Sequence, residues 1–183
     1  MTGKAEAAFI KAFLNLARCK SATDISVTEV AEASCLTRRT FYRHYAGIGD
    51  LAHSAMNSLG RGFASGLSLT GSTNTPAPPA RPARLMPEAY ALAIFGFWEK
   101  ELALLKNIQR SQDAIALLSA WMEGAGAAVH GVNLESAMNN VSARYLTKFM
   151  TGGLAAALLE WVEDERRPAA ADMAHIVSLP FRA

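Results

Sequence analysis

The sequence predicts an all-α protein with a small helical N-terminal unit and a larger helical C-terminal unit. Apolar residues recur at helical spacing in both parts of the chain, and no segment shows the alternation typical of a β-strand. A proline-rich stretch separates the two parts. With 183 residues, of which 51% are hydrophobic, the chain can bury a substantial core.

The N-terminal unit, residues 1–66, is expected to begin and end with an amphipathic helix. Residues 4–20 place apolar side chains on one face and charged or polar ones on the other. Asp50 opens the last helix of the unit, whose buried stripe should consist of Leu51, Ala55, Met56, Leu59 and Phe63.

Two short helices should lie between these longer ones. Ser26 is a favourable N-cap for a helix that ends near Ser34, and Thr37 for a helix that runs to about His44. Only two or three residues separate them. The N-terminal unit is therefore predicted to contain a helix-turn-helix within a three-helix core.

Residues 67–86 are expected to form a flexible linker, because the stretch TGSTNTPAPPARPAR has no periodicity and is rich in proline. The C-terminal unit, residues 87–183, keeps helical spacing throughout. Its helices are predicted at roughly 87–100, 102–110, 112–128, 134–166 and 170–178.

Charge is unevenly distributed between the two units. The residues through 66 carry eight Lys or Arg against five Asp or Glu, a net +3, whereas the rest carry ten against eleven, a net −1. A surface that binds an anionic partner is therefore expected in the N-terminal unit.

The second short helix has the composition of a DNA-reading helix. In a helix-turn-helix this element lies in the major groove, about 12 Å wide, and residues 37–45 read TRRTFYRHY. Arginine matches the O6 and N7 acceptors of guanine, and threonine or tyrosine hydroxyls bond phosphate oxygens. The alternative is that the arginines only solvate an exposed helix face.

The segment from Ser26 to Leu51 resembles the signature of the TetR (tetracycline-repressor-like) family of transcription regulators. That signature has a hydroxyl residue, an apolar–alanine pair, a short turn, and then threonine, tyrosine, histidine and aromatic residues at fixed intervals. The matching residues are Ser26, Val30, Ala31, Ser34, Cys35, Leu36, Thr37, Thr40, Phe41, Tyr42, His44, Tyr45 and Leu51. The resemblance is strong over about the first 60 residues; 145–167 is similar to the long penultimate helix of a subgroup found in Firmicutes-type regulators.

The resemblance implies which residues contact DNA. They are Thr28, Thr37, Arg38, Arg39, Thr40, Tyr42, Arg43 and His44. Arg38, Arg39 and Thr40 would read bases, and the others would contact phosphates or position the helix. A purely structural role stays open for His44, and Phe41 would either touch a thymine methyl or pack in the core.

Two residues depart from the family pattern. Cys35 stands where the family has a turn glycine, which costs about 1 kcal/mol if its φ is positive. Ile48 stands where the family has a lysine that contacts phosphate, so one positive anchor is missing. Arg43 and Lys20 are the residues that could compensate.

The resemblance also implies a homodimer that binds a near-palindromic operator and is released from it by a small hydrophobic effector, as a repressor would be. The expected effector-binding residues are Phe95, Trp98, Trp121, Met122, Tyr145 and Phe149. The expected dimer interface comprises Gly152, Gly153, Ala156, Leu158 and Trp161. Glycines inside a helix cost about 1 kcal/mol each, which suggests close approach of another helix at Gly152 and Gly153.

Other classes of function find little support in the sequence. Four scattered histidines and the lack of GxSxG, HExxH, GxGxxG or phosphate-loop patterns argue against an enzyme, a metal site or a cofactor. No apolar run approaches the ~20 residues of a membrane span, and no signal-peptide core is seen, so a cytoplasmic protein is expected. The main alternative is a helical interaction or dimerisation module that has lost strong DNA binding.

Overall fold

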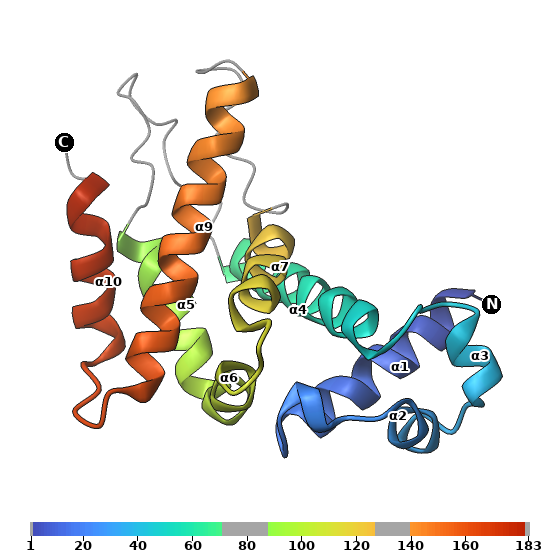
Figure 1. The fold of residues 1–183 in the computed structure, drawn as a ribbon. Helices are drawn as coiled ribbons and strands as arrows, with labels where there is room; N and C mark the ends of the chain where they lie inside the picture. The colour runs from blue at the N-terminus through green and yellow to red at the C-terminus, as the bar shows by residue number, and fades with distance from the viewer. Residues whose placement is uncertain (1, 71–87, 127–139, 182–183) are drawn as a thin grey trace.

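The computed structural model describes residues 2–70, 88–126 and 140–181, and the regular structure in these ranges is entirely helical (Figure 1). The α-helices are α1 (Thr2–Ala17), α2 (Val27–Ala33), α3 (Arg38–Tyr42), α4 (Ile48–Thr70), α5 (Glu88–Lys100), α6 (Leu102–Gln109), α7 (Ala114–Gly126), α9 (Asn140–Glu163) and α10 (Ala170–Ser178). Two short 3₁₀ turns, η1 (Ala22–Asp24) and η2 (Leu179–Phe181), complete the list. The predicted all-α class is confirmed.

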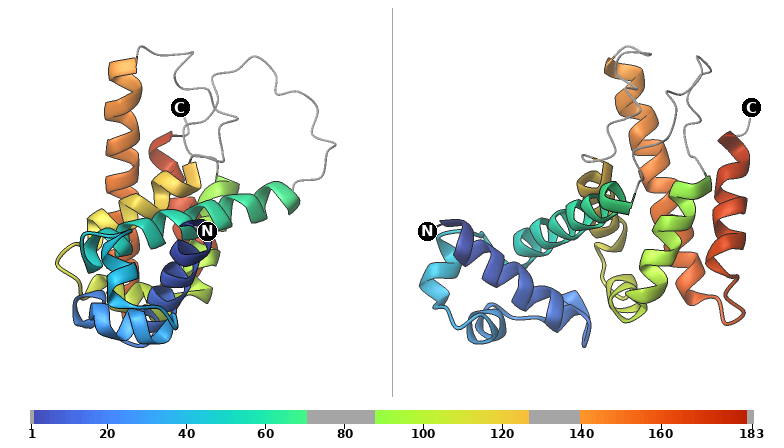
Figure 2. Two further views of the ribbon diagram at one scale, coloured as in Figure 1. Left: turned by 90° about the vertical axis from the view of Figure 1, so that its right-hand side faces the viewer. Right: turned by 180° about the vertical axis from the view of Figure 1, so that it is seen from behind.

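The chain is arranged as a head and a body joined by one long helix. The head consists of α1, α2 and α3, and the body of α5, α6, α7, α9 and α10 (Figure 1). Helix α4 starts in the head and runs across α7 of the body, as the views from the side and from behind also show (Figure 2). Within the body, α10 packs on α5, and α9 packs on α6 and α7.

An aromatic cluster holds the head together. Phe9 on α1 makes edge-to-face contacts with Phe41 and Tyr45, at ring-centroid distances of 5.4 and 6.2 Å. All three side chains are buried, Phe9 and Phe41 completely. Burying a phenylalanine side chain contributes about 1.5–3 kcal/mol, so α1 and α3 are fixed to one another by this cluster.

A second aromatic cluster forms the centre of the body. Trp98 on α5 and Trp121 on α7 lie with their rings 5.1 Å apart, and Phe95 on α5 meets Trp161 on α9 at 5.3 Å. These four side chains are at most 2% exposed. Phe63 of α4 lies 5.1 Å from Trp121, so the connecting helix is part of the same core.

Several helix boundaries differ from the sequence prediction. Helix α4 begins two residues before Asp50 and continues to Thr70, so the first four residues of the expected linker are helical. Helix α3 ends at Tyr42 rather than near His44. Helix α9 ends at Glu163, where the Asp164 carboxylate accepts from the Arg166 backbone N–H and starts a turn. The predicted linker from residue 71, and the start of the predicted 134–166 helix, lie outside the described residues.

Two glycines allow the backbones of α4 and α7 to touch. A Cβ placed on Gly60 would overlap the carbonyl oxygen of Trp121 and lie 2.7 Å from the Ala125 nitrogen. A Cβ on Gly124 would overlap the carbonyl oxygen of Asn57. The Asn57 side-chain amide also donates to the Ala120 carbonyl at 3.3 Å. Only the absence of side chains at both glycines permits this crossing.

Among the described residues of the protomer, Gly152 and Gly153 meet no other helix. Within the described part of the chain, nothing lies within 4 Å of a Cβ built on either residue. Within the protomer, close approach of backbones occurs between α4 and α7 instead. Approach of a helix from a second copy at Gly152 and Gly153 stays a prediction.

Replacing Gly60 by alanine should destabilise the protein by about 1–3 kcal/mol, because the new methyl group must displace backbone atoms of α7. Gly62→Ala is the matched control on the same helix, since a Cβ there meets nothing within 4 Å. Alanine favours a helix over glycine by about 1 kcal/mol, so the control should be as stable as the wild type or more so. Urea unfolding of both variants measures the difference, and equal effects would show that the crossing tolerates a methyl group.

Candidate nucleic-acid interface

The first helix of the helix-turn-helix starts with a capping box. The Ser26 hydroxyl accepts from the Glu29 backbone N–H at 3.3 Å, and the Glu29 carboxylate accepts from the Ser26 backbone N–H at 2.9 Å. Each bond satisfies an N–H group that the helix itself leaves without a partner. The predicted N-cap at Ser26 is confirmed, and the start of α2 is fixed by local sequence.

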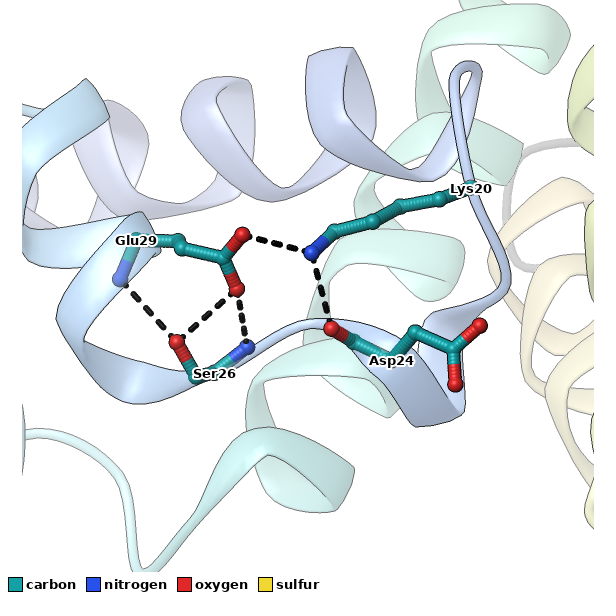
Figure 3. Close-up of polar contacts among 4 residues, drawn as sticks. All are labelled: Lys20, Asp24, Ser26 and Glu29. Carbon is teal, nitrogen blue, oxygen red and sulfur yellow. Dashed lines mark hydrogen bonds and ion pairs between the residues drawn. The ribbon is translucent and has the colours of Figure 1, made fainter.

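Lys20 reinforces the same corner of the head (Figure 3). Its ammonium group lies 2.5 Å from a Glu29 carboxylate oxygen and donates to the Asp24 carbonyl at 2.8 Å. The bond from Lys20, followed by the bonds from Ser26, lowers the pKa of Glu29 to about 2. Lys20 therefore has acceptors inside the head, which corrects the expectation that it is available to replace the missing phosphate anchor.

The turn between α2 and α3 has the hydrogen bonds of a Schellman motif. The Leu36 N–H donates to the Ala31 carbonyl and the Cys35 N–H to the Glu32 carbonyl, both at 3.0 Å. Cys35 has a φ of 56°, the left-handed conformation that glycine adopts most easily. The suspected backbone strain at this departure from the family pattern is therefore present.

Thr37 caps the second helix of the motif, as predicted. Its hydroxyl accepts from the Thr40 backbone N–H at 3.1 Å and lies 3.0 Å from the Thr40 hydroxyl. The two threonines thus hold each other at the start of α3. Phe41 is fully buried beneath them, so it packs in the core rather than facing a nucleic acid.

The outer face of α3 carries basic and aromatic side chains. Arg38, Arg39, Tyr42 and Arg43 are exposed, Tyr42 by 52%. A surface hollow of about 550 Å³ is lined by Arg39, Thr40, Tyr42 and Arg43. Thr28 is exposed at the start of α2. The structure therefore brings most of the predicted DNA-binding residues onto the surface of one motif.

His44 does not share that surface. Its side chain is 4% exposed, and its Nδ1 atom lies 3.2 Å from a carboxylate oxygen of Glu6 on α1. Its ring also lies 6.4 Å from the Phe9 ring. Of the two roles left open for His44, the geometry favours the structural one, in which it fastens α1 to the end of α3.

The second departure from the family pattern has a structural explanation. Ile48, the first residue of α4, is partly buried and packs against the hydrophobic core of the protein. Arg43 is exposed in the turn that leads to it. An apolar contact has thus replaced a charged one at this helix start, and Arg43 is the exposed cation nearest to it in sequence.

The six residues expected to bind an effector are not brought together. Phe95, Trp98, Trp121 and Met122 are buried in the body, whereas Tyr145 and Phe149 on α9 are 65% and 71% exposed. The Trp98 and Trp121 rings contact each other, and the Phe95 ring contacts Trp161. Tyr145 and Phe149 therefore belong to a surface rather than to the same cluster.

The residues expected in the dimer interface also divide into two groups. Leu158 and Trp161 are buried within the protomer, at 0% and 2% exposure. Gly153 and Ala156 are exposed and Gly152 is half-buried. At 100° per residue, Tyr145, Phe149, Gly152, Gly153 and Ala156 lie on one side of α9. We call this set the α9 face.

Sequence reasoning missed the contacts that join the head to the body. They include the bond from Asn107 to the Ala17 carbonyl and the ion pair of Arg18 with Glu101. The partners are 90 and 83 residues apart in sequence, so no local sequence pattern indicates these contacts. The described residues include no helix suited to crossing a membrane, and in the same ranges no three His, Cys, Asp or Glu side chains are grouped as metal ligands.

The head, the connecting helix and the helical body define a two-part helical protein with a helix-turn-helix at one end. No protein-family model and no curated protein sequence matches the chain. Solved structures, however, match the chain in fold. A TetR-family transcriptional regulator from Streptomyces coelicolor is 18% identical with a TM-score of 0.55, and the match covers 96% of this chain and 80% of that one.

Two further structures show the same architecture. The dihydroxyacetone kinase operon activator DhaS is 10% identical with a TM-score of 0.51 over 94% of this chain and 91% of its own. The fatty acid degradation regulator FadR from Bacillus halodurans is 15% identical with a TM-score of 0.53 over 95% and 92%. The chain has the fold of TetR-like regulators.

Cys35→Gly should stabilise the protein by about 1 kcal/mol, because glycine removes the penalty of a side chain at positive φ. The neighbouring Ser34→Gly is the control: Ser34 has a right-handed conformation, with φ −89° and ψ −6°, so glycine there should destabilise. The denaturant concentration at the midpoint of unfolding should rise for Cys35→Gly and fall for Ser34→Gly. A loss of stability in both would contradict the strain assigned to Cys35.

Proposed function

We propose that the chain is a sequence-specific DNA-binding transcription regulator that reads its operator through α3. The observation that carries this proposal is the outer face of α3, where three arginines and Tyr42 are exposed on the second helix of a helix-turn-helix. Phe41 is buried on the opposite side of the same helix. The helix is thus anchored on one side and polar on the other, as insertion into a major groove requires.

The residues of this surface would have different roles in binding DNA. Arg38 and Arg39 have the reach and the paired donors to recognise guanine in the major groove, with Thr40 beside them. The remaining exposed residues, Thr28, Tyr42 and Arg43, would contact phosphates and set the register. Thr37 and His44 would position α3 through their bonds inside the head. A prokaryotic cytoplasm would be the place of action.

A homodimer is part of the proposal, because two heads related by a two-fold axis would read a near-palindromic operator. The α9 face supports it. Phe149 and Tyr145 expose most of their surface there, and the small residues that follow leave room for a second helix to approach. We therefore assign Tyr145 and Phe149 to the dimer interface and not to an effector site.

Release from DNA by a small effector is proposed on a different observation. The indole N–H groups of Trp98 and Trp121 are buried, and neither has an acceptor in the described part of the chain. A ligand with an oxygen acceptor and an apolar body would satisfy them at the centre of the body. We propose repression as the sign of regulation, although one protein of the same fold, DhaS, is an operon activator by name.

Selection of bound duplexes from a random DNA pool tests the function. A near-palindromic consensus, with affinity that falls steeply as salt rises, is the expected result. If no sequence is enriched above background, the chain is not a sequence-specific regulator. The interaction-module alternative would then be favoured.

Arg39→Ala should weaken binding to the selected operator by about 1–3 kcal/mol and relax the preference at one base position. Arg61→Ala is the matched control, because it removes the same charge from α4, where Arg61 bonds to Asn57 of its own helix. Titration of both variants against operator and random duplexes distinguishes a base contact from a phosphate contact. An equal loss on both duplexes for Arg39→Ala would make Arg39 a phosphate contact.

Ala156→Glu should convert the dimer to monomers, because it places a charge in the middle of the α9 face. Ala116→Glu, at an exposed alanine of α7, is the matched control and should leave the dimer intact. Sedimentation velocity of the two variants and the wild type measures the mass. A dimeric Ala156→Glu variant would show that the interface lies elsewhere.

A further inference from the structure

The head is attached to the body by side-chain contacts that are separate from α4. Arg18, just after the end of α1, forms a two-pronged ion pair with Glu101, just before α6. Its Nε atom lies 2.8 Å from one carboxylate oxygen, and a terminal nitrogen lies 3.0 Å from the other. A two-pronged arginine–carboxylate pair fixes orientation as well as distance, because both groups are planar.

A second bond lies beside this pair. The Asn107 side-chain amide donates to the Ala17 carbonyl at 2.9 Å, and both residues are buried. Ala17 is the last residue of α1, where backbone carbonyls lack partners within the helix. Asn107 thus supplies a bond that the head cannot make for itself.

Together these two contacts hold the end of α1 at two points on the body. Glu101, the N-cap of α6, and Asn107 within α6 are six residues apart, or about 9 Å at 1.5 Å per residue. Two points of attachment resist rotation of α1 on the body, whereas a single point would allow it. We call these residues, Arg18 with Glu101 and Asn107 with the Ala17 carbonyl, the α1–α6 clamp.

The pair in the clamp is also placed well with respect to the helix ends. Arg18 lies at the negative C-terminal end of α1, and Glu101 at the positive N-terminal end of α6. The exposed fractions of the two side chains are 36% and 23%, so water screens the pair only in part. Apart from α4, the principal contact of the head with the body is that of α1 with α6.

We propose that the α1–α6 clamp fixes the angle between α3 and the body, and so sets the spacing of operator half-sites that the dimer accepts. This inference rests on the proposed function. In a two-fold dimer the distance between the two α3 helices must match the half-site separation, which changes by about 3.4 Å per base pair. A head held only by α4 can turn and accept several spacings. Arg18, Glu101 and Asn107 are then positioning residues that touch no DNA.

The test is a selection from duplex pools in which the spacer between two half-sites varies in length. The wild type should enrich one spacer, whereas Glu101→Gln and Arg18→Ala should reduce its enrichment over neighbouring spacers on the order of 5-fold or more. The half-site sequence should stay the same, because α3 is unchanged. The charge swap Arg18→Glu with Glu101→Arg should restore part of the preference, and Arg110→Ala, at an exposed arginine at the far end of α6, should have no effect on it.

The possible outcomes distinguish a failure of the clamp proposal from a failure of the proposed function. If the wild type enriches no half-site, the proposed function fails and the clamp proposal with it. If the wild type enriches paired half-sites and the clamp variants keep its spacer preference, only the clamp proposal is overturned. A loss of preference in Arg110→Ala, or a changed half-site sequence in Glu101→Gln, also overturns it. Glu101→Gln keeps the size of the side chain, so it supplies the answer if Arg18→Ala does not fold.

Discussion

The backbone crossing of α4 and α7, where Gly60 meets Trp121 and Gly124 meets Asn57, is the constraint on which the arrangement of head and body depends. Helix α4 belongs to both parts, and its crossing with α7 is the most extensive helix contact among the residues that the structure describes. Because backbone touches backbone there, α4 cannot slide or turn on α7 without a clash. The N-terminal half of α4 carries the head with it. The direction of α3 relative to the body is therefore determined in part by two residues without side chains that lie outside the helix-turn-helix.

The head could be predicted from sequence because its determinants are local. Ser26 and Glu29 are three residues apart, as are Thr37 and Thr40, and each pair completes a cap without help from the rest of the chain. The head-to-body contacts could not be predicted, because Asn107 and Ala17 meet only after folding. The same applies to Gly60, since an isolated glycine in a helix does not identify the helix that will approach it.

The α9 face shows a second limit of sequence reasoning. Periodicity places Phe149 and Leu158 on α9 as apolar residues at helical spacing, but it does not say which side of the helix faces the protomer's own core. Phe149 is 71% exposed and Leu158 is fully buried. A helix that is apolar on more than one side can pack on more than one surface, and the pattern alone cannot say which side packs on the protomer's own core. This is why the expected effector and interface residues were each divided between core and surface.

Part of the positive charge of the head is paired with carboxylates of the head and of the body. Arg18 and Lys20 contribute to the net charge of +3 over the first 66 residues, yet both are held by carboxylates of the protein itself. Ile48 adds no charge at the start of α4. The positive surface of the helix-turn-helix thus rests on the arginines of α3 and the turn that follows it. For the proposed regulator, few phosphate anchors make non-specific attraction to DNA modest. Recognition of a half-site would then depend on Arg38 and Arg39, and the two attachments of the head would set only where the two α3 helices of a dimer stand relative to each other.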